Sequence, residues 1–210
     1  MSAGVRRTLL VVLGVTATVL TAFAPLPAGA NSTRQSGGTL PAGHPRAALL
    51  PFENLAGREE QGALFTRIFF AHLMASGAFE MVDPASVEQG MDALLVRSTG
   101  SLTPEQIRAL GDTLHAPYLL IGSVLESGKL QSGGVELPSV GATLRLVEAT
   151  SGRVVWAGVH FRTGEDHESL FGWGRVRSAE KLISMLADGI LGEFRAAGER
   201  ERRAANGGKR

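Results

Sequence analysis

Arg46-Ala-Ala-Leu-Leu-Pro-Phe52 is the stretch of sequence that decides the fold of this chain. Its short apolar run, residues 47–50, is typical of a strand buried in the centre of a sheet, and Pro51 ends that run. Two further strand-like segments, Tyr118–Ser123 and Thr150–Trp156, follow later in the chain, each with a turn or helix signal beside it. Together these segments predict a sheet on which helices pack.

The remaining elements are predicted from capping and turn signals. Asp83-Pro84 and Thr103-Pro104 are helix starts, and Gly77 is a helix end. The expected order is strand 47–50, helix 59–76, strand 79–82, helix 83–96, helix 103–114, strands 117–126, 139–148 and 153–161, and helix 177–194. This order predicts an α/β fold: a single domain with a mixed sheet, helices packed on it and an antiparallel hairpin toward its C-terminal end.

Two of these helices carry an apolar stripe that is expected to face the sheet. In the helix over 59–76 the stripe consists of Leu64, Phe65, Ile68, Phe69 and Leu73, and in the last helix it consists of Val176, Ala179, Ile183, Leu186, Ala187 and Ile190. His72 falls within the first stripe, so we expect a hydrogen-bonded core histidine. Phe70 and Met74 lie on the other side of that helix, where they either pack on another element or form an exposed partner patch.

Composition excludes several kinds of chemistry. The chain has 210 residues, 44% of them hydrophobic, which suits one domain with a real core. It contains no cysteine, which excludes disulfides, thiol catalysis, thiolate metal sites and lipid attachment at a cysteine. Aromatic residues make up only 6% of the chain, too few for extensive stacking on bases or sugars.

The N-terminal 30 residues are predicted to be a cleaved signal peptide. Arg6 and Arg7 form its basic start, the apolar middle spans 9–23, and Ala28-Gly29-Ala30 supplies the small residues of a cleavage site. The alternative is an uncleaved anchor, for which the apolar run is at the short limit. Either way we expect export to the periplasm, with outer-membrane association left open.

The rest of the chain is divided by composition and charge. Residues 31–45 form a predicted flexible tether, 46–194 the folded domain, and 195–210 a basic tail. Residues 31–194 carry 13 Lys and Arg against 18 Asp and Glu, whereas residues 195–210 carry six against two. An acidic body argues against nucleic-acid binding. The tail is either a frayed terminus or a peripheral contact for anionic lipid or an acidic partner.

No catalytic motif is found, so we expect no enzyme activity, no cofactor and no metal. The sequence lacks a nucleophile elbow, a phosphate-binding loop and a zinc-protease motif. His160, Glu165 and His167 leave open a metal-dependent or hydrolytic enzyme as an alternative. A solvated polar loop is the expected reading, because neighbouring loop residues rarely converge on one ion.

A loop before the last helix is the candidate binding site. Its sequence, Leu-Phe-Gly-Trp-Gly-Arg over residues 170–175, combines aromatic residues with glycine. Because tryptophan and arginine are favoured interface anchors, Phe171, Trp173 and Arg175 are predicted to contact a partner. The alternative is a loop folded over the protein's own core.

Four motifs in order resemble a family of periplasmic domains. They are Pro51-Phe52-Glu53-Asn54, Ser76-Gly77-Ala78-Phe79, the approach from Leu110 to Gly122-Ser123, and Thr150-Ser151-Gly152-Arg153-Val154-Val155-Trp156, which has one inserted serine. The pattern is similar to that of the curli secretion protein CsgG, the LpoB activators of penicillin-binding proteins and the N-terminal domain of TolB. The resemblance covers about residues 46–194 and consists of turns, caps and core strands.

The resemblance implies a non-catalytic periplasmic adaptor or assembly factor that binds another cell-envelope protein. A channel, a secretion complex or a peptidoglycan synthase is the expected partner, and a homo-oligomer is also expected to be feasible. A CsgG-like oligomeric secretion component at the outer membrane is the alternative. The slots for its pore hairpins, Ser127–Pro138 and Thr163–Val176, are too short here, which argues against a channel. The missing lipidation cysteine departs from LpoB.

Overall fold

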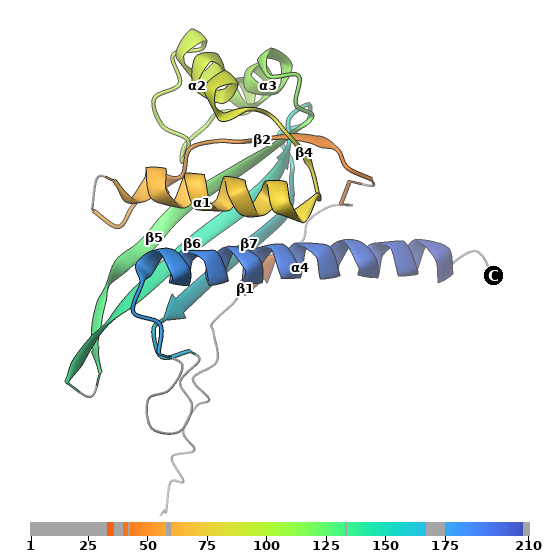
Figure 1. The fold of residues 1–210 in the computed structure, drawn as a ribbon. Helices are drawn as coiled ribbons and strands as arrows, with labels where there is room; N and C mark the ends of the chain where they lie inside the picture. The colour runs from red at the N-terminus through yellow and green to blue at the C-terminus, as the bar shows by residue number, and fades with distance from the viewer. Residues whose placement is uncertain are drawn as a thin grey trace, which may run out of the picture.

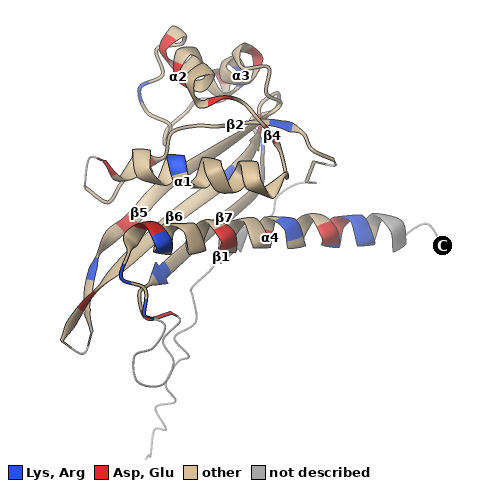
Figure 2. Cartoon of the chain, in the orientation of Figure 1, with Lys and Arg blue, Asp and Glu red and all other residues tan. Residues whose placement is uncertain are grey.

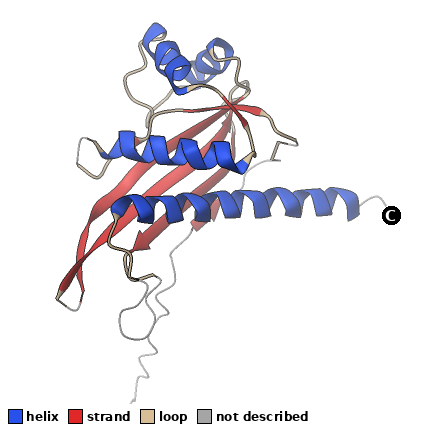
Figure 3. Cartoon of the chain, viewed as in Figure 1, coloured by secondary structure: helices blue, strands red, loops and turns tan. Residues whose placement is uncertain are grey.

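The predicted fold class is confirmed: the protein is a mixed α/β domain with helices on an open sheet (Figures 1 and 3). The computed structural model describes residues 33–35, 40–41, 43–57, 60–132, 134–166 and 175–207. The sheet has seven strands in the order β1-β7-β6-β5-β2-β4, and β3 also pairs with β5. Helices α1 and α4 lie side by side across one face, and α2 and α3 lie at one end of the other face.

The predicted strands and helices are present in the predicted order with shifted ends, and β1 and β3 are short strands that the sequence did not predict. The strands are β1 Thr33–Gln35, β2 Arg46–Leu49, β3 Glu53–Asn54, β4 Glu80–Met81, β5 Tyr118–Ser132, β6 Val135–Glu148 and β7 Val154–Thr163. The helices are α1 Gln61–Ser76, α2 Pro84–Ala93, α3 Pro104–Thr113 and α4 Ala179–Gly207. β2 runs parallel to β4 and β5, whereas β5, β6, β7 and β1 pair antiparallel in turn.

Residues 47–50, in and directly after β2, are all apolar because each face of the sheet at this point is covered by a different pair of helices. Ala47 and Leu49 point into the core beneath α1 and α4. Ala48 and Leu50 point to the opposite face of the sheet, into the second core with α2 and α3. Alternation along a strand therefore assigns neighbouring residues to two separate cores.

The capping signals form as the sequence predicts. The Asp83 carboxylate accepts hydrogen bonds from two backbone N–H groups at the start of α2. Thr103 and Gln106 form a reciprocal capping box on α3, with distances of 3.3 and 2.9 Å. Gly77 ends α1 in the left-handed conformation, with φ 60°. Local sequence therefore fixes where these helices start or stop.

Two of the resemblance motifs meet in the core beneath α1. The Phe52 ring packs directly over Gly122 of β5, so closely that a Cβ on Gly122 would lie 2.4 Å from two ring carbons. The same ring lies 4.7 Å from the Phe69 ring, centroid to centroid, and is 4% exposed. The glycine is therefore required for space rather than for backbone conformation.

The hairpin of β5 and β6 is longer than the sequence predicts. The expected strands ended at 126 and began again at 139, but pairing continues to Ser132 opposite Val135. Lys129 and Glu136 form a cross-strand ion pair of 2.8 Å within this extension. We call residues 127–138 the ribbon. The polar and glycine-rich sequence over 127–134 hid the strands, because the tip of the ribbon extends beyond α1 (Figure 1), whereas Leu137 at its base is 1% exposed.

The segments expected to be a tether and a tail make contacts with the domain. Thr33–Gln35 adds a strand to the edge of β7. Leu40 is 7% exposed, and its N–H donates to the Glu201 carboxylate at 2.6 Å. Helix α4 does not end at Phe194 but continues to Gly207, because alanine, arginine and glutamate favour helix and no proline intervenes. Parts of the segments predicted as a flexible tether over 31–45 and a basic tail over 195–210 therefore contact the domain.

Candidate functional site

The hypothetical metal or hydrolase site combines His160 with Glu165 and His167. In the structure, His160 instead lies beside Glu193. His160 is 3% exposed under α4, and its Nε2 lies 3.2 Å from Glu193 Oε2, although the two are not well aligned for a hydrogen bond. Glu165 lies in the turn after β7, and His167 lies outside the described residues. Within the described ranges, no group of three or more His, Cys, Asp or Glu side chains is placed to hold a metal.

The surroundings of His160 fix α4 on the sheet. Burial lowers the pKa of His160; the nearby Glu193 carboxylate opposes this shift, and Arg162 adds to it. Gly189 of α4 sits over this group, where a Cβ would lie 3.3 Å from Arg162 Nη2 and 3.7 Å from His160 Nδ1. Arg162 Nη1 in turn lies 3.7 Å from Asp166 Oδ2. These polar side chains therefore lie where they attach α4 to the sheet.

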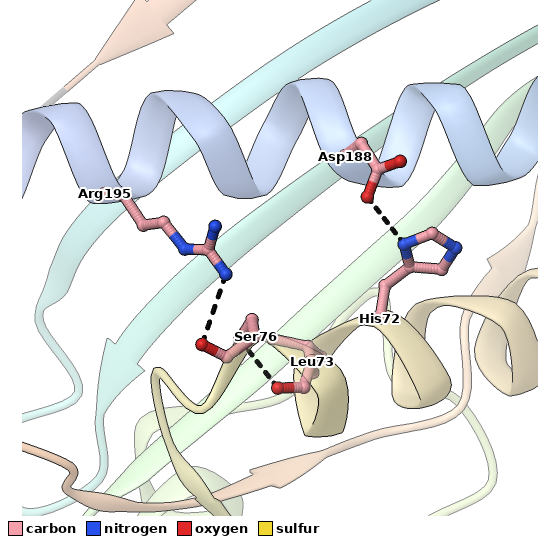
Figure 4. A network of polar contacts seen from close by, with 5 residues as sticks. All are labelled: His72, Leu73, Ser76, Asp188 and Arg195. Atoms are coloured by element: carbon pink, nitrogen blue, oxygen red, sulfur yellow. Dashed lines mark hydrogen bonds and ion pairs between the residues drawn. The ribbon is translucent and has the colours of Figure 1, made fainter.

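A second set of polar contacts joins α1 to α4 (Figure 4). His72 Nδ1 lies 2.7 Å from Asp188 Oδ1, and Arg195 donates to the Ser76 carbonyl at 3.2 Å. The expectation of a core histidine is wrong at His72, because its half-buried ring points across the helix–helix junction toward an exposed carboxylate. These contacts, with the apolar stripes beneath them, hold the two helices side by side.

The predicted partner-binding loop is only partly described. Phe171 and Trp173 lie outside the described residues, so their role stays a prediction. Arg175 is half-buried directly before α4. The next residue, Val176, is 4% exposed and donates its N–H to the Gly164 carbonyl at 2.9 Å, which anchors the chain where it returns to the domain.

Several surface features gather at one end of the sheet, which we call the ribbon end. It comprises the ribbon, the start of α1 and residues 164–166, which follow β7. Ser127 Oγ donates to Gln61 Oε1 at 2.7 Å, which ties the ribbon to the first turn of α1. Thr163, at the end of β7, pairs with Ser139 at the base of the ribbon. Leu130, on the ribbon, is 46% exposed.

The outer edge of the ribbon is also open. β3 pairs with β5 only at Ser123 and Val124, and within the described chain no strand other than β6 pairs with β5 beyond that point. An open strand edge carries unpaired N–H and C=O groups that another chain can bind. Sequence reasoning missed this edge because it had placed the ribbon in a loop.

The outward side of α1 is unusually apolar. Ala63, Arg67, Ala71, Met74 and Ala75 are exposed, and we call these five residues the α1 outer face. Met74 is 54% exposed, as the partner-patch alternative expected, whereas Phe70 packs partly against the core. The sequence signal for this face was present, because only Arg67 and His72 are ionisable among the 16 residues of α1.

A groove lies where the N-terminal segment meets the second half of α4. Its apolar lining includes Leu40, Phe79 and Phe194, and its rim includes Arg195 and Arg202. Arginine recurs along this part of α4 (Figure 2). Its volume is about 200 Å³, small for a ligand site, which typically takes 300 Å³ or more.

Among the described helices, none is sufficiently long and apolar to cross a membrane.

The fold and these surfaces define an α/β domain suited to contacts with other proteins. Residues 60–160 match the family model described as peptidoglycan-synthase activator LpoB, a match of just under half of the chain. The match begins at the start of α1 and includes the ribbon and most of β7. It supports the LpoB part of the resemblance, whereas the CsgG and TolB parts stay predictions. Among curated proteins, none matches the chain.

Solved structures share the fold at low identity. The PelC dodecamer from Paraburkholderia phytofirmans is similar with a TM-score of 0.51 and 21% identity, over 78% of this chain and 95% of that one. Lipoprotein GNA1162 from Neisseria meningitidis is similar with a TM-score of 0.53 and 17% identity, over 72% and 99%. At these identities the likeness shows the fold alone.

Proposed function

We propose that this protein is a non-catalytic component of the cell envelope that binds a peptidoglycan synthase. The observation that carries this proposal is the match of residues 60–160 to the peptidoglycan-synthase activator model. The matched segment includes the ribbon and α1, so it contains exposed surface as well as core. The predicted signal peptide over residues 1–30 supports a periplasmic location.

The ribbon end is the surface we assign to this partner. It joins an open strand edge, the exposed Leu130 and residues 164–166, from which the sequence continues to α4. Phe171, Trp173 and Arg175 belong to that continuing sequence, and we propose that they anchor the contact. Aromatic and arginine anchors surrounded by a polar rim are the usual composition of a binding hot spot. The ribbon would supply backbone hydrogen bonds, and the anchors would supply apolar burial.

Capture of partners from crosslinked envelopes tests the proposal. The tagged protein is expected to retain a peptidoglycan synthase, and Trp173→Ala and Leu130→Ala are each expected to reduce its recovery. Val154→Ala is the matched control, because Val154 is also an exposed apolar strand residue, 38% exposed, but lies at the opposite end of the sheet. Equal loss of the synthase with the control, or capture of no synthase at all, would refute the proposal.

The same experiment tests the alternative of an oligomeric secretion component. That alternative is favoured by the fold shared with PelC, a protein solved as a dodecamer. Recovery of a large assembly of this chain alone, unaffected by Trp173→Ala, would support the alternative and count against a synthase partner.

A further inference from the structure

Helix α1 is apolar around its whole circumference. Its core side is buried at Phe65, Phe69 and Leu73, and the α1 outer face adds four apolar residues to one arginine. Figure 2 shows α1 without charge along nearly all of its length. A helix that is apolar on every side is normally covered on every side. The α1 outer face therefore has the composition of a surface that another protein covers.

The charges beside this face follow a self-complementary pattern. Glu60 and Arg67 are seven residues apart, which is close to two helical turns, so both lie on the same side of the helix. Both are exposed, and neither forms an ion pair with a described residue. Ala63 and Leu64 lie midway between them. Glu60, Ala63, Leu64 and Arg67 also line a shallow hollow on this side of α1.

A two-fold axis through the midpoint would satisfy both charges at once. Two antiparallel copies of α1 crossing at Ala63 and Leu64 place Glu60 of each copy opposite Arg67 of the other. Such an interface is isologous, meaning that the same patch serves both copies. The small Ala63 side chain lets the two helix backbones approach closely at the crossing. An unrelated partner needs no such balance of opposite charges around one point.

We propose that the N-terminal half of this strip, Ala63 and Arg67 of the α1 outer face with Glu60 and Leu64, binds the same residues of a second copy of this chain. This inference does not depend on the proposed synthase partner. With the axis between Ala63 and Leu64, the two helices overlap over residues 60–67, a strip about 12 Å long, so the contact buries less than the roughly 1,200 Å² of a stable interface. The dimer is therefore weak and concentration-dependent.

Sedimentation of the protein isolated from the envelope, from micromolar to hundreds of micromolar concentration, tests this proposal. Glu60→Lys and Arg67→Glu should each weaken dimerisation by about tenfold or more, because each places like charges opposite one another twice. The double variant carrying both reversals should restore the dimer. Glu88→Lys is the matched control, since Glu88 is equally exposed but lies on α2, against the other face of the sheet.

Each result decides the proposal. Dimerisation that is lost in both single variants, restored in the double variant and kept in the control supports it. A protein that stays monomeric throughout overturns it, as does a dimer that the single reversals leave intact. Loss without restoration in the double variant overturns the antiparallel pairing. A monomer whose capture of a synthase is abolished by Arg67→Glu would assign the face to that partner and also overturn the proposal.

Discussion

The contact between Phe52 and Gly122 gives the sharpest prediction about stability. A methyl group on Gly122 would lie 2.4 Å from the Phe52 ring, well inside the ordinary contact distance of carbon atoms. The ring is held on its other side by Phe69, at 4.7 Å, so it cannot simply withdraw. We therefore expect Gly122→Ala to lower the free energy of unfolding by about 1–3 kcal/mol.

A double-mutant cycle separates this overlap from other effects. Phe52→Ala alone should cost about 3–5 kcal/mol, because it leaves a cavity in a core that is otherwise filled. In the double variant the new methyl group enters that cavity, so the two losses should not add, and the coupling should be about 1–3 kcal/mol. The matched control is Gly128→Ala, on the same strand, where nothing lies within 4 Å of the added Cβ.

Urea unfolding monitored by tryptophan fluorescence measures the stability of the four proteins of the cycle and of the Gly128→Ala control. Trp156 reports on the same core, since it is 1% exposed. The reasoning would be refuted if the stability losses of Gly122→Ala and Phe52→Ala sum to the loss of the double variant within about 0.5 kcal/mol, because distant and independent sites behave in that way. So would a Gly122→Ala variant that is as stable as the Gly128→Ala control.

Three further predictions concern a helix end, a buried histidine and the end of α4. Leu95 has φ 54° and is 71% exposed, so Leu95→Gly should raise the free energy of unfolding by about 0.5–1 kcal/mol. A thermal midpoint no higher than that of Leu95→Ala would contradict this. Burial lowers the pKa of His160 in the folded state, so the unfolded state gains the proton first on acidification. Stability should therefore fall as pH drops below about 6.5, and His160→Gln should flatten this dependence in urea midpoints measured across that range. An unchanged slope would exclude His160 as its source. Deleting residues 195–210 should cost about 2 kcal/mol or more, because Ala197 is 3% exposed and Arg195 and Glu201 each make a hydrogen bond to a distant segment. An unchanged urea midpoint would show that this part of α4 adds nothing.

The sequence predicts features of the fold that depend on neighbouring residues. Asp83, Thr103 and Gly77 mark helix ends because each side chain or backbone acts within its own turn. The alternating apolar residues of β6 reveal its strand in the same way. The fold class followed from these local signals, since their order leaves few arrangements.

The features that sequence reasoning missed depend on distant partners. Thr33–Gln35 is a strand only because the edge of β7 lies beside it. Residues 195–204 remain helical beside Leu40, which is far away along the chain. The sequence predicts His72 to lie in the core because it falls within the apolar stripe of the helix over 59–76. Only the placement of α4 shows that Asp188 faces it.

The candidate site was less predictable than the fold. Arg175 is placed before α4, whereas Phe171 and Trp173 lie beyond what the structure describes, so their role stays a prediction. The ribbon emerges only in three dimensions, whereas the sequence signals the α1 outer face only in part, through the few ionisable residues of α1. Their exposure depends on which elements leave them uncovered, and no local pattern reports this.

The glycan polymerisation rate of the captured synthase tests the central claim most directly. The rate is measured with the purified synthase alone, with this protein added, and with the Trp173→Ala variant added. We predict a higher rate with the protein and a smaller increase with the variant, at equal folded concentration. A rate that this protein leaves unchanged, at concentrations where the two proteins are bound to one another, would contradict the claim.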